Sequence, residues 1–129
     1  MSGDLTMKRW VGRWIILVGV IHCVFGAIVF FEPISAMLRD GLWNAVSGYP
    51  GRPLAFWFEL LGVLMILFGA AVDQLEKNQQ ALPSFLGFGF AFLTVLAIVA
   101  MPRSGGWLMV PGVVGLLMKS TAVPSQISR

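Results

Sequence analysis

Two ionisable side chains, those of His22 and Glu59, stand inside apolar stretches of the sequence. An imidazole or a carboxyl group in such surroundings can relay a proton or hold the polar part of a lipid-like ligand, and ionisable residues within a membrane are functional candidates by default. The alternative is structural, since polar contacts also join membrane helices. We therefore predict either a proton relay or ligand site at His22 and Glu59, or a hydrogen bond that only packs helices.

No other residue pattern indicates chemistry. A single histidine excludes a multi-histidine metal site, and a single cysteine, Cys23, excludes a dithiol redox pair. No nucleophile is accompanied by a base and an orienting group in a recognisable pattern. The nine Lys and Arg residues are spread along the chain and form no basic stripe for nucleic acid. We expect a protein that is not an enzyme and that uses neither a cofactor nor a metal.

The composition indicates where such a chain resides. Of its 129 residues, 57% are hydrophobic and 12% are charged, whereas soluble domains are about 25% charged. A small soluble fold has too much surface for its volume to hide this much apolar area. The composition therefore predicts a protein embedded in a lipid bilayer.

Four apolar stretches with few or no charges indicate membrane-crossing helices, each of which needs about 20 mostly apolar residues. Prolines and tryptophans flank these stretches, as expected at helix ends and at the headgroup level. The predicted fold class is an all-α integral membrane four-helix bundle, formed by a single domain over residues 1–129. The expected spans are about 12–31, 54–72, 84–101 and 106–122.

The connection between the first two spans has an amphipathic pattern. Its apolar residues recur at intervals of three or four, which predicts a short helix over about 34–47 in the membrane interface. An irregular loop is the alternative, because Gly41 falls on the apolar side and glycine disfavours helix. The apolar residues are Ile34, Met37, Leu38, Leu42 and Val46.

Glycines recur at seven-residue spacing in the first two spans, which places them on one face of each helix. Lipid provides no hydrophobic drive between helices, so small residues that permit close packing matter. We expect the two faces to meet within one chain, with a homodimer interface as the competing use. These helix-packing glycines are Gly12, Gly19, Gly26, Gly62 and Gly69.

The two ionisable residues fall on the same glycine faces. His22 follows Gly19 by three residues, and Glu59 precedes Gly62 by three. In an antiparallel hairpin, His22 and Glu59 then lie within about one helical turn of the same depth. We expect their side chains to face inward and to hydrogen-bond to each other.

The counts of Lys and Arg predict the orientation, because cytoplasmic loops carry an excess of these residues. With four spans, six of them share a side with both termini and three lie on the other side. Both termini are therefore expected in the cytoplasm. The six are Lys8, Arg9, Arg13, Lys77, Lys119 and Arg129, and the three are Arg39, Arg52 and Arg103.

Three motifs carry a resemblance to a known family. They read WVGRWIILVGVIHCVFG from Trp10 to Gly26, WFELLGVLMILFG from Trp57 to Gly69, and MPRSGGWLMVP from Met101 to Pro111. The chain resembles a family of small bacterial four-span membrane proteins catalogued as a domain of unknown function. The resemblance implies a bacterial inner-membrane protein with His22 at a recurrent position, and it implies no activity, substrate or cofactor.

The first functional hypothesis is a non-enzymatic membrane protein. On its outer-leaflet side it would hold a polar-floored pocket for a small hydrophobic molecule, or it would serve as an accessory subunit of a membrane protein partner. The alternative is a small dimeric proton-coupled transporter that uses Glu59 and His22. Small multidrug transporters are similar in length and span count, but they carry their membrane acid in the first span, whereas Glu59 lies in the second.

Overall fold

The computed structural model describes residues 9–103 and 105–121, and all regular elements in this part of the chain are helices. Lys8, Arg129 and the expected end of the fourth span at residue 122 lie outside the described residues. Two of the helices, the first and the third, are long and apolar enough to cross a membrane. In chain order the elements are α1 (Val11–Val29), α2 (Phe31–Arg39), α3 (Arg52–Lys77), α4 (Ser84–Ala100), the 3₁₀ helix η2 (Gly105–Met109) and α5 (Val110–Thr121).

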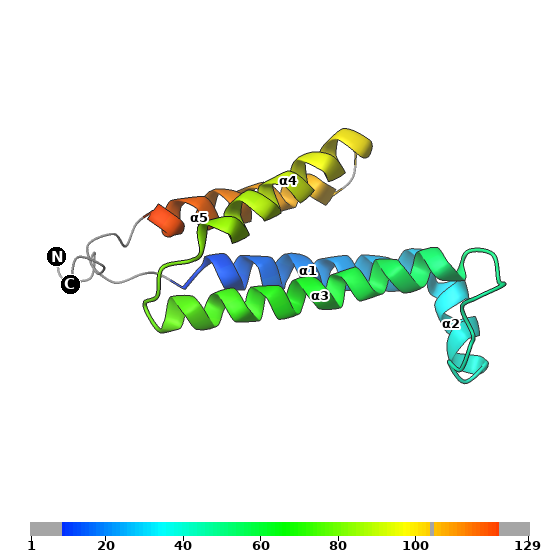
Figure 1. Cartoon of the computed structure of the whole chain (residues 1–129). Coiled ribbons are helices and arrows are strands. Elements are labelled where there is room, and N and C mark those ends of the chain that lie inside the picture. The colour runs from blue at the N-terminus through cyan, green and yellow to red at the C-terminus, as the bar shows by residue number, and fades with distance from the viewer. Residues whose placement is uncertain (1–8, 104, 122–129) are drawn as a thin grey trace.

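Helices α1 and α3 run antiparallel and side by side along their length (Figure 1). Small residues let the two backbones approach. A Cβ atom on Gly69 would lie 2.8 Å from the carbonyl oxygen of Gly12, and one on Gly19 would lie 2.8 Å from Cγ1 of Ile66. Opposite Gly19, Gly62 leaves room for the thiol of Cys23. The predicted glycine faces therefore form the contact between α1 and α3.

Helices α4 and α5 form a second hairpin, which joins the first pair at one end. A buried apolar cluster lies at this end, and the rings of Phe68 on α3 and Phe90 on α4 stack there with centroids 5.1 Å apart. Toward Ala100 the hairpin leans away from α1 and α3 (Figure 1). The buried cluster consists of Val11, Ile15, Val72, Leu82 and Leu116.

The break between α1 and α2 corrects the predicted end of the first span. The span was expected to reach residue 31, but α1 ends at Val29 and a new helix begins at Phe31. Pro33 explains the break, because its ring would clash with the carbonyl of Val29 in a continuous helix and its nitrogen has no hydrogen to donate. The N–H group of Phe30 still donates to the carbonyl of Gly26 at 2.8 Å.

The interfacial helix predicted over 34–47 is shorter and begins earlier. It is α2, and it ends at Arg39, because Gly41, Leu42 and Asn44 have φ angles of +82°, +68° and +50°. A right-handed helix cannot continue through such residues. The segment turns back, so that Met37 packs on Ala45 and on Ala55 of α3 in a second apolar cluster.

The fourth predicted span is divided, and the second is longer than expected. Residues 105–109 form a 3₁₀ turn, and the α-helix starts only at Val110, with Pro111 in its first turn, where a missing N–H group costs nothing. Helix α3 extends five residues past the expected end at residue 72. The polar residues of this extension bind partners on α1 and α5.

Candidate functional site

His22 lies on the contact between α1 and α3, where its ring stacks on the ring of Phe58. The ring centroids are 3.9 Å apart and the planes differ by 12°. Nε2 of His22 lies 3.0 Å from the backbone carbonyl oxygen of Phe58. A carbonyl oxygen can only accept, so the hydrogen bond requires the proton on Nε2. His22 is therefore a donor to the backbone of α3.

Glu59 is the next residue on α3, and its side chain packs against α1 where Gly26 lacks a Cβ atom. An added Cβ at Gly26 would collide with Oε1 of Glu59. This carboxyl oxygen is buried and has no hydrogen-bond partner among the described residues. The Sγ atom of Cys23 makes a long contact of 3.9 Å with the backbone oxygen of Glu59. His22 and Glu59 both lie on the contact between α1 and α3, but the predicted hydrogen bond between their side chains is not formed. His22 bonds to the backbone of Phe58, and Oε1 of Glu59 has no partner among the described residues.

Aromatic rings lie beside His22. The ring of Phe58, which covers His22, has its centroid 6.2 Å from that of Phe25 and 5.2 Å from that of Phe30. Phe30 is the residue at the break between α1 and α2. The ring of Phe58 therefore covers one face of the partly buried imidazole and connects it to Phe30 at the bend of the chain.

A second polar site, at the opposite end of the α1–α3 pair, centres on the fully buried Glu76. Its carboxylate accepts hydrogen bonds from the backbone N–H groups of Val11 at 3.2 Å and Gly12 at 2.8 Å. These are free donors at the N-terminus of α1, where the helix dipole also favours negative charge. Lys119 of α5 forms an ion pair with the same carboxylate. One side chain of α3 therefore binds both α1 and α5.

Asp73, one turn before Glu76, extends this polar site toward the surface. Its two carboxylate oxygens accept from Nε of Arg9 at 3.1 Å and from Nη2 of Arg9 at 2.7 Å. Arg13 lies 3.6 Å from Asp73. The hydrogen bond from Arg9 to Asp73 raises the pKa of the Arg9 guanidinium above its ordinary value. The segment that leads into α1 is thus held to the end of α3 by a two-point ion pair.

Asp73 and Glu76 were not predicted as site residues from the sequence, although a signal for Glu76 was present. Glu76 continues the seven-residue spacing of Gly62 and Gly69, so it had to face α1. The arginines and Lys119 were counted only for orientation. Their role as partners becomes visible when the helix ends are placed in space.

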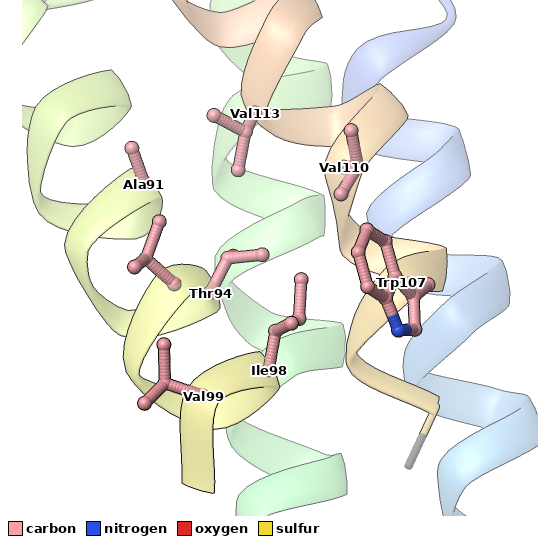
Figure 2. Close-up of a pocket in the computed structure, with 8 residues that line it drawn as sticks. Ala91, Thr94, Ile98, Val99, Trp107, Val110 and Val113 are labelled. Atoms are coloured by element: carbon pink, nitrogen blue, oxygen red, sulfur yellow. The ribbon is translucent and has the colours of Figure 1, made fainter. Parts of the chain in front are cut away.

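A cavity of about 360 Å³ lies between α4 and the segment formed by η2 and α5 (Figure 2). Its walls are apolar, and the side chain of Thr94, which is among the lining residues, is buried. The indole of Trp107 forms one side and donates a hydrogen bond from Nε1 to the carbonyl oxygen of Pro102 at 2.9 Å. Neither His22 nor Glu59 lines this cavity, so the polar floor expected for a pocket is not formed by them. The lining includes Ala91, Thr94, Ile98, Val99, Trp107, Val110 and Val113.

A family model, Family of unknown function (DUF6463), matches residues 6–123. The chain belongs to this family. The predicted resemblance to a family of unknown function is therefore confirmed. No match to the DUF6463 chain was found among curated proteins or solved structures.

Membership of a family of unknown function implies no activity, so a function has to be inferred from the arrangement of the residues. Within residues 9–103 and 105–121, no three His, Cys, Asp or Glu side chains gather in a group that would hold a metal ion. This member of the DUF6463 family presents three features of interest: the His22–Glu59 region, the polar site at Glu76, and the apolar cavity beside Trp107.

Proposed function

We propose that the chain is a multi-pass protein of the bacterial inner membrane, in which α4 and the η2–α5 segment add two spans to α1 and α3. Helix α4 has 17 residues, and η2 and α5 have 5 and 12. At the usual rise per residue these segments are about 26 Å and 28 Å long. A hydrocarbon core is about 30 Å thick and adapts to small mismatches.

The outward faces of the helices support this placement. Large apolar side chains such as Leu64, Phe88 and Phe92 are mostly exposed. Contiguous apolar surface of this extent is unfavourable in water and indicates a lipid contact. The positively charged Arg9 and Arg13 lie at the Glu76 end, which favours a cytoplasmic location for this end and for both termini.

Within the membrane, the proposed function is the non-enzymatic binding of a small apolar molecule in the cavity between α4 and α5. The single observation that carries this proposal is the cavity itself. Ligand sites usually have volumes of about 300–1,000 Å³, with apolar walls and a few polar groups that orient the ligand. The walls here are apolar, so apolar contacts would hold the ligand. A role as an accessory subunit would use the same cavity for an apolar segment of a partner.

The proposal is tested by filling the cavity. The protein is purified in a mild detergent, and bound small molecules are extracted and measured by mass spectrometry. Ala91→Phe places a ring in the cavity, whereas Ala97→Phe changes an exposed residue of the same helix that does not line it. We expect wild type and Ala97→Phe to carry about one apolar molecule per chain, and Ala91→Phe to carry none. Equal amounts in all three proteins would contradict the proposal.

The second candidate is a dimeric proton-coupled transporter that uses Glu59 and His22. The observation in its favour is the buried Oε1 atom of Glu59, which has no hydrogen-bond partner among the described residues. In reconstituted vesicles such a transporter would move substrate in response to a pH gradient. Glu59→Gln, which keeps shape but removes titration, would abolish that flux. A monomer without flux, together with a bound apolar molecule, would favour the first candidate.

A further inference from the structure

We propose that the cavity between α4 and α5 holds one acyl chain of an anionic phospholipid, and that Arg103 binds the phosphate of that lipid. This inference rests on the proposed function, because it names the apolar molecule. The cavity is at the small end of the range for ligand sites. It therefore suits part of a single chain, with the rest of the lipid remaining in the bilayer.

The surroundings of the cavity favour a lipid as its occupant. The residues of α4 next to the lining residues have exposed apolar side chains, so this helix faces hydrocarbon once it is in a membrane. Membrane lipids are the apolar molecules present at the highest concentration beside such a surface. An acyl chain can enter from the side without leaving the bilayer.

The position of Arg103 favours a negatively charged headgroup. The connection between α4 and η2 closes the hairpin at one end of the cavity, and Arg103 lies in it, four residues from Val99 and four from Trp107. Both neighbours line the cavity, so the guanidinium group is within a short reach of its end. Trp107 marks the headgroup level, where indoles are enriched.

Arg39 and Arg103 are among the described basic side chains near helix ends that form no ion pair or hydrogen bond, and Arg103 is the one next to the cavity. Its side chain is exposed and has no ion pair or hydrogen bond with another described residue. By contrast, Arg52 donates to Asp40 at 2.9 Å and to the carbonyl of Ala45 at 2.7 Å, and Arg9 binds Asp73. A cation beside an apolar cavity, with no acidic side chain bound to it, is complementary to a lipid phosphate. A zwitterionic headgroup would be bound less well, because its own cation offsets the phosphate.

Lipid binding to delipidated protein, followed by native mass spectrometry, tests this inference. Phosphatidylglycerol and phosphatidylcholine with the same acyl chains are titrated separately, and oleic acid is added as a competitor. We expect one phosphatidylglycerol per chain, bound about fivefold more tightly than phosphatidylcholine, which is the effect of one basic side chain at an anionic surface. Arg103→Gln should lower the affinity for phosphatidylglycerol to that for phosphatidylcholine. Arg39→Gln, the matched control on α2, should leave the preference unchanged.

The variants separate failure of this inference from failure of the proposed function. If Ala91→Phe loses both lipids but Arg103→Gln keeps the full preference, the cavity is a binding site and the assignment of the headgroup to Arg103 is wrong. That assignment is equally wrong if Arg39→Gln loses the preference to the same extent, or if oleic acid displaces phosphatidylglycerol at equal concentration. If Ala91→Phe binds both lipids as wild type does, the cavity is not the site, and the proposed function fails with it.

Discussion

Glu76 is the residue at which three helices meet, since its carboxylate contacts the N-terminus of α1 and Lys119 of α5. Glu76→Gln removes the negative charge. The amide NH₂ group of the glutamine is a donor, and it would face the N–H groups of α1 and the ammonium group of Lys119, which are donors as well. We expect a loss of about 3–5 kcal/mol in the free energy of unfolding, as for other buried ion pairs broken on one side. Thermal unfolding in detergent measures this loss.

A surface ion pair provides the control for Glu76. Asp40→Asn breaks the pair with Arg52, in which the aspartate side chain is 47% exposed, and should cost less than about 1 kcal/mol. Replacing Lys119 by Met in the Glu76→Gln background should restore part of the stability. Equal losses for Glu76→Gln and Asp40→Asn would show that the buried pair contributes little.

Glu59 presents the opposite case, because its buried Oε1 has no hydrogen-bond partner among the described residues. Removing an unsatisfied polar group in favour of an apolar one of similar size is neutral or stabilising. We therefore expect Glu59→Leu to raise the free energy of unfolding by up to about 1 kcal/mol. A clear loss of stability in the same unfolding assay would mean that the carboxyl group forms a bond that packs the helices.

At the scale of elements, the contact between α1 and α3 depends on backbone approach at glycine. A Cβ on Gly69 would lie 2.8 Å from the backbone nitrogen of Ile16, and backbone atoms cannot move aside. Gly69→Ala should therefore cost about 1–3 kcal/mol, the usual penalty of overpacking. Gly89→Ala, on the open face of α4, should stabilise by up to about 1 kcal/mol through helix propensity.

The result for the two glycine variants is measured by thermal unfolding and by the yield of folded protein. If Gly69→Ala and Gly89→Ala behave alike, the close contact between the two backbones does not determine stability. Gly12→Ala offers an independent check, because an added Cβ would collide with the backbone of Asp73.

The elements predicted best from the sequence are the long apolar helices, in which small residues recur at regular spacing. The register of Gly12, Gly19 and Gly26 follows directly from their spacing, which fixes a helix face. The predicted extent of the interfacial helix was wrong. The apolar pattern over 34–47 continues through Gly41, whose left-handed backbone conformation belongs to the turn that follows α2. Local patterns carry little information about where such a turn occurs.

The candidate site was predictable only in part. The residue spacing predicted His22 and Glu59 at similar depth, but rotamers decide that Nε2 of His22 reaches the carbonyl of Phe58 and not the carboxyl of Glu59. The partners of Glu76 come from segments more than 40 residues away in the chain. The cavity beside Trp107 depends on how α4 packs against η2 and α5, which no residue spacing encodes.

At the scale of the whole molecule, the proposed four spans would place the 40–48 segment and the C-terminus on opposite sides of the membrane. A reporter that is active only in the cytoplasm is fused after Arg129, and a second copy is inserted within 40–48. We expect activity from the first fusion alone, because the Lys and Arg excess lies on the side of both termini. Activity from both positions, or from the second alone, would contradict the four-span topology with cytoplasmic termini.

The leaning of the α4–α5 hairpin has a further consequence for motion. At the Glu76 end the hairpin is tied to α1 and α3 by the buried cluster, whereas toward Ala100 helix α4 packs mainly on η2 and α5. Local opening begins where tertiary contacts are fewest. In hydrogen-exchange measurements, amides at the Ala100 end of α4 should therefore exchange before those near Gly87. The Ala100 end of the hairpin would therefore open locally while the Glu76 end stays packed. The cavity beside Trp107 lies in the half that opens.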